Sequence, residues 1–171
     1  MHEQAIQHFK NADPILDYVI GKVGALDYTP ESDGFAFLVQ VIIGQMLSAK
    51  AADTIHSRLL AKVDGTVTPT AVAMLEEDSL RSLGIARRKA QTILALAQQV
   101  IQDPQVLDDL ASLDDRQCLA CLCRYKGIGP WTAKMYLIFV LDRPDVLPLE
   151  DGAFLQAYRH LYGDADNRVG G

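Results

Sequence analysis

Apolar residues recur along this chain at helical spacing, and no stretch alternates apolar and polar residues cleanly enough to predict a strand. From Phe35 to Leu47 the run is apolar on nearly every side, which predicts a central buried helix. Residues 86–102 place their apolar side chains on one side, which predicts a long amphipathic helix. The expected fold class is therefore all-α, with many short helices.

Capping signals divide the rest of the chain into short helices. A small polar residue followed by Pro, as in Asp13-Pro14 and Thr68-Pro69, is typical of a helix start. Gly at 24 and 84 is expected to end helices. The positions expected to begin helices are Asp13-Pro14, Ser48, Thr68-Pro69, Asp78 or Ser79, a capping box that starts at Ser112, Pro130, and Gly152.

The composition fits a globular protein of one domain or of two small helical lobes. The chain has 171 residues, of which 49% are hydrophobic and 22% charged. No apolar run approaches the roughly 18 residues that would suggest a membrane span, and the first residues lack an apolar signal core. We therefore expect no membrane association and a cytoplasmic location, at the nucleoid if the source is bacterial.

Charge and cysteines narrow the possible partners. The net charge of −6 argues against broad affinity for polyanions, although basic residues gather at 87–89 and at Arg124, Lys126 and Lys134. The odd set Cys118, Cys121 and Cys123 cannot form a disulfide framework. A metal site would need a fourth Cys or a His at suitable spacing, so core thiols are the preferred interpretation.

A Gly-rich turn carries the most specific local signal. In LCRYKGIGPWTA, residues 122–133, Gly127 and Gly129 flank Ile128 and permit a sharp hairpin between two helices. Ile128 is expected to anchor the turn in the core. Pro130 then begins a helix whose open N–H groups suit a phosphate oxygen. Taken alone, the motif is equally compatible with a plain helix–helix turn.

Three further segments make the pattern more specific. Residues 43–52, IGQMLSAKAA, and 83–90, LGIARRKA, precede the hairpin, and DVLPLED follows it at 145–151. In this order the blocks resemble the helix-hairpin-helix DNA glycosylase superfamily, and within it the 3-methyladenine DNA glycosylase II (alkylation repair) branch. The resemblance covers the span from Phe35 to Leu161.

The resemblance implies a two-lobed, all-α helix-hairpin-helix glycosylase fold. One lobe is expected at about 35–110, and the other at 1–34 with 111–171, within a single unit of 1–171. The chain ends at Gly171, 20 residues after Asp151, whereas the family normally continues with one or two further helices. We therefore expect a version that lacks the last helices.

The resemblance also implies an activity: hydrolysis of the N-glycosidic bond to alkylated purines such as 3-methyladenine, in base excision repair. By its position in the resemblance, the family's catalytic Asp corresponds to Asp151. A carboxylate is suited to this role because it stabilises the positive charge that develops on the sugar and can orient water. The alternative for Asp151 is a helix N-cap, and both roles are compatible. Glu150 is the rival carboxylate, one position out of register.

Further residues take roles from the same resemblance. Met46 is expected to wedge into the space that a flipped base leaves. The equal alternative is that Met46 and Leu47 are both core residues of a buried helix.

The resemblance also implies a K⁺ or Na⁺ ion on the backbone of Tyr125 and Ile128, whereas no Fe–S cluster is expected. Trp131 and Met135 are expected to line the base pocket. The residues expected at the DNA are Lys126, Gly127, Ile128, Gly129, Thr132, Lys134, Met46 and Ser48.

Position 131 separates reaction types in this superfamily. Members that also cut the backbone usually carry a Lys there, which forms a Schiff base with the sugar. Trp131 therefore predicts a monofunctional enzyme. We also expect a monomer whose partner is double-stranded DNA that contains damaged bases. The alternative is a non-catalytic helix-hairpin-helix DNA-binding module.

Overall fold

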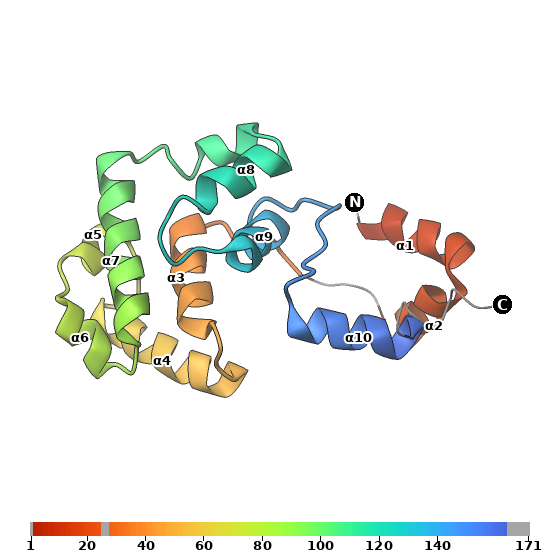
Figure 1. Ribbon diagram of the computed structural model, residues 1–171, viewed down its shortest axis with the longest axis horizontal. Coiled ribbons are helices and arrows are strands. Elements are labelled where there is room, and N and C mark those ends of the chain that lie inside the picture. The colour runs from red at the N-terminus through yellow and green to blue at the C-terminus, as the bar shows by residue number, and fades with distance from the viewer. Residues whose placement is uncertain (1, 25–27, 164–171) are drawn as a thin grey trace. The chain divides into compact units, whose positions relative to one another are not determined.

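The computed structural model describes residues 2–24 and 28–163, and within them it contains helices and no strand (Figure 1). The chain divides into two compact units, Pro30–Pro148 and the pair of segments Met1–Thr29 and Leu149–Gly171. The all-α class is confirmed. The lobe boundaries expected from the sequence stay a prediction.

The larger unit, Pro30–Pro148, contains most of the helices. Several of them pack against helices that are not their neighbours in the sequence. The elements are α3 (Gly34–Gly44), α4 (Ala49–Lys62), α5 (Pro69–Ala73), α6 (Glu77–Ser82), α7 (Arg87–Gln102), the 3₁₀ helix η1 (Asp109–Ser112), α8 (Asp115–Leu122) and α9 (Pro130–Phe139).

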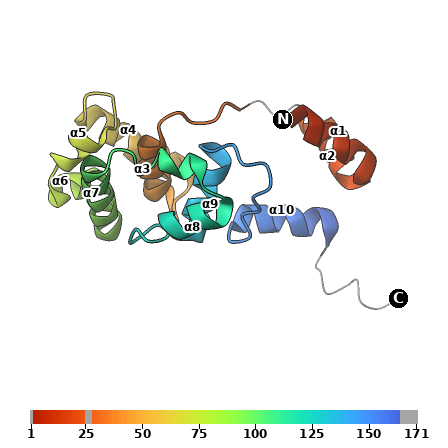
Figure 2. The same ribbon diagram turned by 90° about the horizontal axis from the view of Figure 1, so that it is seen from above.

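Helix α3 is the centre of this unit. Its residues Leu38, Val39 and Ile42 are fully buried, and the helix packs against α4, α7 and α9. Both views show α3 between α7 and α9 (Figures 1 and 2). The predicted central buried helix is confirmed, but it ends at Gly44 rather than continuing through Leu47.

Several predicted caps are present, and two are corrected. Ser48 and Thr68 each accept a hydrogen bond from the backbone three residues ahead, as expected. Neither Asp78 nor Ser79 begins α6, because that helix already starts at Glu77 without a side-chain cap. Ser112 is not the N-cap of α8, since its hydroxyl donates to a carbonyl of the preceding 3₁₀ turn.

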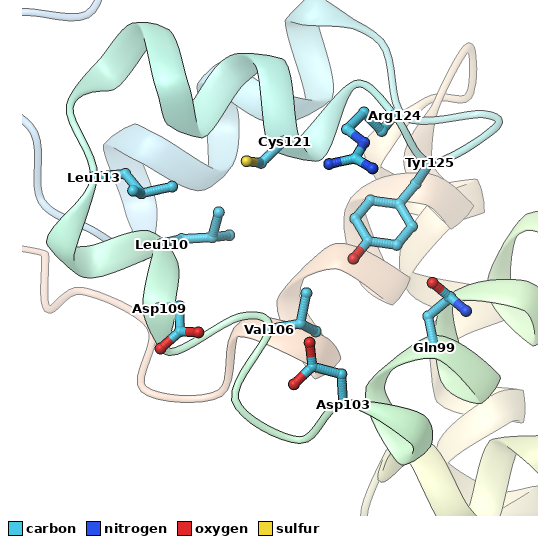
Figure 3. Close-up of a pocket in the computed structure, with 9 residues that line it drawn as sticks. All are labelled: Gln99, Asp103, Val106, Asp109, Leu110, Leu113, Cys121, Arg124 and Tyr125. Atoms are coloured by element: carbon cyan, nitrogen blue, oxygen red, sulfur yellow. The ribbon is translucent and has the colours of Figure 1, made fainter.

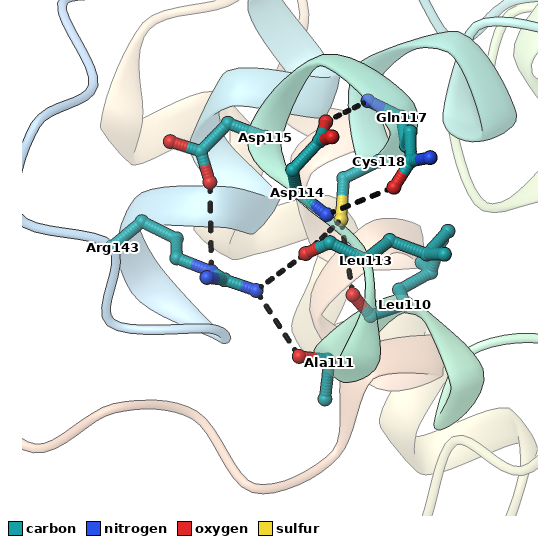
Figure 4. Close-up of polar contacts among 8 residues, drawn as sticks. All are labelled: Leu110, Ala111, Leu113, Asp114, Asp115, Gln117, Cys118 and Arg143. Carbon is teal, nitrogen blue, oxygen red and sulfur yellow. Dashed lines mark hydrogen bonds and ion pairs between the residues drawn. The ribbon is translucent and has the colours of Figure 1, made fainter.

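The true capping box lies two residues later. Asp114 accepts a hydrogen bond from the Gln117 amide, and the Gln117 side chain accepts one from the Asp114 amide (Figure 4). Beside it, the Arg143 guanidinium donates to the carbonyls of Ala111 and Leu113 at 3.1 and 2.9 Å. Arg143 therefore fixes the segment that follows α9 to the turn that precedes α8.

The smaller unit holds α1 (His2–Ala12), α2 (Pro14–Val23) and α10 (Gly152–Tyr162). Asp13 caps α2 as predicted, and the Tyr162 hydroxyl donates to its carboxylate at 2.7 Å. This hydrogen bond and the cap lower the pKa of Asp13. No residue of α2 or α10 is buried. Helix α1 was not predicted, because its sequence is largely polar.

Candidate functional site

The hairpin between α8 and α9 folds as its glycines predict. Ile128 is 3% exposed and anchors the turn, as expected. Gly127 adopts φ +94°, a conformation that favours glycine, whereas Gly129 at φ −98° does not require one. A Cβ at 127 would also overlap the hydroxyl of Thr92 on α7. Gly127 is therefore needed for two reasons, and the hairpin lies directly against α7.

The hairpin presents open backbone donors. The Ile128 amide donates to the Tyr125 carbonyl at 3.0 Å, which closes the turn. Within the described ranges, the amides of Gly127 and Gly129 have no hydrogen-bond acceptor. Gly129 is the N-cap of α9, and Pro130 occupies its first position. Open amides at a helix start, with the helix dipole behind them, form an anion-binding surface.

Gln45 connects this hairpin to the end of α3. Its side-chain amide donates to the Gly127 carbonyl at 3.2 Å and to the Thr132 hydroxyl at 3.0 Å. Thr132 is only 2% exposed, so its side chain faces the protein and not a ligand. The expected DNA contact at Thr132 can therefore involve only its backbone. No role for Gln45 was predicted from the sequence, although Gln45 lies within the block IGQMLSAKAA.

Lys89 fixes the same corner from α7. Its ammonium group donates to the carbonyls of Ile43 and Gln45 at 2.8 and 2.6 Å. These carbonyls belong to the last residues of α3 and its C-cap, which lack helical partners. Burial lowers the pKa of Lys89. Lys89, Gln45 and the hairpin thus form one polar network. The role of Lys89 in this network was not predicted from the sequence.

Replacing Lys89 with Met is expected to lower the free energy of unfolding by about 2 kcal/mol, because two charge-assisted hydrogen bonds are lost. Urea unfolding followed by circular dichroism measures the change. The control is Lys50→Met, since Lys50 is exposed on α4 and should change stability by less than about 0.5 kcal/mol. Equal stability of the two variants would contradict the structural role of Lys89.

The segment after α3 projects from the surface. Met46 is 101% exposed and adopts φ +58°, which is unfavourable for a residue with a side chain. Leu47 is 42% exposed. The interpretation of Met46 and Leu47 as core residues is therefore wrong, because Lys89 and Gln45 end the helix before them. Ser48 next caps α4, where its hydroxyl accepts from the Ala51 amide at 3.4 Å.

A cavity of about 400 Å³ lies beside this segment. Trp131 and Met135 of α9 both line it, so the structure brings together the two residues expected to form a base pocket. Most of the lining is apolar, and the polar side chains come from Gln40, Asp53 and His56. The lining residues are Phe37, Gln40, Val41, Gly44, Leu47, Ala49, Ala52, Asp53, His56, Trp131, Met135 and Phe139.

His56 is the ionisable ring of this cavity, and the sequence analysis did not single it out. Burial lowers its pKa below the usual range, and the Asp53 carboxylate partly opposes this effect. The imidazole is therefore neutral at pH 7, with one donor and one acceptor nitrogen. Only its position on α4, four residues before the partly buried Leu60, could have indicated it.

A second cavity, of about 470 Å³, is lined in part by the first residues of the hairpin segment. The Arg124 guanidinium and the Tyr125 ring point into it, together with the carboxylates of Asp103 and Asp109 (Figure 3). Burial raises the pKa of Tyr125. The charge of Arg124 is thus accompanied by two acidic groups. Lys126 is exposed at the turn itself, whereas Lys134 is half-buried on α9.

Asp151 belongs to the smaller unit. It caps α10, and its carboxylate accepts a hydrogen bond from the Phe154 amide at 2.8 Å. The N-cap interpretation is therefore confirmed, and the catalytic role stays a prediction. Asp151 is half-buried, whereas Glu150, the rival carboxylate, is exposed.

The three cysteines differ in their surroundings. Cys118 is buried, and its thiol donates to the Leu110 carbonyl at 3.0 Å, as a core thiol would. Cys121 is half-buried and Cys123 is exposed, so the core interpretation is wrong for Cys123. Among the residues that the structure describes, no group of three or more His, Cys, Asp or Glu is placed to bind a metal ion, and no helix could span a membrane.

Comparison with known proteins agrees with this geometry. DNA-3-methyladenine glycosylase 1 of Schizosaccharomyces pombe is 29% identical over 128 residues, which cover 73% of this chain and 56% of that protein. The alkylbase DNA glycosidase-like protein mag2 of the same yeast is 25% identical over 169 residues, which cover 95% and 79%. The chain thus spans about half the length of the first relative and four fifths of the second.

A solved structure supports the fold directly. The 3-methyladenine DNA glycosylase Mag1 of S. pombe, in complex with abasic DNA, matches with a TM-score of 0.83 and 26% identity, over 92% of this chain and 80% of that one. The helix-hairpin-helix glycosylase fold expected from the sequence is confirmed. Residues 39–168 match the family described as HhH-GPD superfamily base excision DNA repair protein. The chain belongs to this superfamily.

Proposed function

We propose that this protein is a monofunctional DNA glycosylase that releases alkylated purines by hydrolysing the N-glycosidic bond. The observation that carries the proposal is the Gln45 network, which holds the open amides of the hairpin beside the cavity lined by Trp131 and Met135. A phosphate-binding turn next to an aromatic-lined cavity is what an enzyme needs to hold a strand and receive a flipped base.

The comparisons support the same activity. The relative that shares 29% identity is named a 3-methyladenine glycosylase, and the similar solved structure contains abasic DNA. Abasic DNA is what remains after a base has been hydrolysed from its sugar. We propose that the protein acts as a monomer on duplex DNA inside the cell.

The chemistry follows from the charge of the substrate. A purine alkylated on a ring nitrogen carries positive charge and leaves readily, so a strong general acid is not needed. Its flat cationic face is attracted to the ring of Trp131. Asp151 is proposed to stabilise the positive charge that develops on the sugar and to orient water. Because Trp131 stands where bifunctional relatives usually carry a Lys, no Schiff base is expected.

A monovalent cation at the hairpin is proposed as well. The Tyr125 carbonyl accepts one hydrogen bond from the Ile128 amide and has a second lone pair for an ion. The Gly127 carbonyl, in contrast, already accepts from Gln45. K⁺ or Na⁺ on the carbonyls of Tyr125 and Ile128 would supply positive charge to a phosphate oxygen. The proposal contains no Fe–S cluster.

Met46 is proposed to fill the gap that the flipped base leaves in the duplex. Met46→Gly is expected to weaken binding to duplex DNA with an abasic-site analogue about tenfold, a loss of roughly 1.4 kcal/mol. The same change should not lower stability, and we expect a gain of about 0.5 kcal/mol because glycine accepts positive φ. Fluorescence anisotropy and urea unfolding measure the two effects.

The matched control is Asp64→Gly. Asp64 is also exposed with φ +54°, so the substitution should give the same small gain in stability. Its DNA affinity should stay within twofold of the wild type. If Met46→Gly binds as tightly as Asp64→Gly, Met46 has no wedge role.

The decisive experiment incubates the protein with methylated duplex DNA and identifies any released base by chromatography. Free 3-methyladenine or 7-methylguanine is expected, with an intact abasic strand. Duplex binding without release would favour the non-catalytic DNA-binding module. Trapping of a covalent protein–DNA adduct with borohydride would contradict the monofunctional mechanism.

A further inference from the structure

A cavity of about 490 Å³ lies on the flank of the hairpin, where the turn packs against α7. Gly127 and Thr92, which lie directly against each other, both line it. We call it the flank pocket. Its lining residues are Arg88, Gln91, Thr92, Ala95, Lys126 and Gly127.

The charged groups of the flank pocket are both positive. Arg88 and Lys126 are exposed, and neither forms an ion pair with any residue that the structure describes. Other arginines nearby are compensated: Arg87 pairs with Glu77 at 2.8 Å, and Arg81 pairs with Asp78 at 2.7 Å. In a chain of net charge −6, two uncompensated cations in one hollow favour an anionic ligand.

The neutral lining residues are consistent with this ligand. The Thr92 hydroxyl donates to the Arg88 carbonyl at 3.0 Å, and the Gln91 side-chain amide donates to Glu77 at 2.9 Å, so both are fixed within the protein. The open amide of Gly127 belongs to the anion-binding surface of the hairpin. The donors left for a second ligand are therefore a guanidinium and an ammonium group, which match phosphate oxygens.

We propose that the flank pocket binds a second phosphate of the DNA backbone, next to the one at the hairpin amides, with Arg88 as its main contact. This inference rests on the proposed function, since it extends the path of the same DNA strand from the hairpin onto α7. A guanidinium fork binds two phosphate oxygens at once, so Arg88 also fixes the register of the strand. Lys126 contributes as a point charge at the edge.

The test compares Arg88→Gln with Arg87→Gln. The two positions are adjacent on α7 and the substitutions change net charge equally, but only Arg88 lines the flank pocket. Binding of a duplex with a non-hydrolysable abasic-site analogue is measured by fluorescence anisotropy over a range of KCl concentrations. Arg88→Gln should bind about tenfold more weakly. Its slope of log affinity against log salt concentration should become less steep by about 0.9, as expected when one phosphate contact is lost. Arg87→Gln should keep the wild-type slope and stay within twofold of the wild-type affinity.

Two further measurements interpret the result. Equal urea midpoints for the two variants exclude a folding defect. If wild-type protein fails to bind the duplex, the proposed function itself fails. If wild type binds and the two variants lose the same affinity and slope, the flank pocket is not a phosphate contact. If inorganic phosphate at constant ionic strength binds wild type but not Arg88→Gln, and leaves the affinity of wild type for the duplex unchanged, the pocket takes free phosphate and the assignment to the DNA backbone is wrong.

Discussion

Replacing Asp151 with Asn is expected to slow release of alkylated purine by about a thousandfold under single-turnover conditions, as when one charge-stabilising group is lost from a transition state. The amide cannot oppose the positive charge that develops on the sugar. Asn caps helices about as well as Asp, so α10 should keep its start and its hydrogen bond to Phe154. Chromatography of base released from methylated duplex DNA measures the rate.

Further variants separate catalysis from capping. Asp151→Ala removes the charge and also the hydrogen bond to the Phe154 amide, so it should be as slow as Asp151→Asn and about 1 kcal/mol less stable. Asp33→Asn makes the same exchange at the N-cap of α3 and should keep full activity. Glu150→Gln should also stay active. An active Asp151→Asn beside an inactive Asp151→Ala would show that the residue only caps.

Gly127→Ala is expected to lower the free energy of unfolding of the Pro30–Pro148 unit by about 3 kcal/mol. A positive φ costs a residue with a Cβ about 1–2 kcal/mol, and overpacking a filled site costs roughly 1–3 kcal/mol more. Here the new Cβ would overlap the Thr92 hydroxyl and lie 2.9 Å from its Cγ2. DNA binding should weaken together with stability, because the open amides move with the turn. Urea unfolding and anisotropy measure both.

Gly129→Ala is the matched control within the same turn. Gly129 has φ −98°, and a Cβ there would have no neighbour within 4 Å, so stability should change by less than about 0.5 kcal/mol. In a Thr92→Ala background the overlap at position 127 is removed, and Gly127→Ala should then cost only the backbone part, about 1–2 kcal/mol. Similar losses for Gly127→Ala in both backgrounds would contradict the packing explanation.

Much of the fold follows from local signals. The caps at Asp13, Ser48 and Thr68 were predictable because a side chain and the backbone two or three residues ahead form the whole interaction. Ser112 was misassigned for the same local reason: Asp114, two residues later, offers an equally good cap, and only the preceding 3₁₀ turn decides between them. Helix α1 could not be predicted from its polar sequence.

The candidate site was predictable only where a motif carried it. The hairpin and the pairing of Trp131 with Met135 followed from the resemblance, and the structure brings the latter two together in one cavity. The end of α3 did not follow, because the residues after Gly44 continue the apolar run. What stops the helix is a tertiary contact, the ammonium of Lys89 on the last carbonyls. No local pattern encodes that contact.

The hydrogen bonds of Gln45 also have a consequence for the order of folding. Its two partners in the hairpin lie 82 and 87 positions further along the chain. During synthesis the loop that carries Met46 therefore emerges long before the hairpin can hold the Gln45 side chain in place. A nascent chain that has reached only α7 lacks both partners. The network that joins Gln45 to the hairpin, where DNA binding is proposed, is then complete only after Thr132 has left the ribosome.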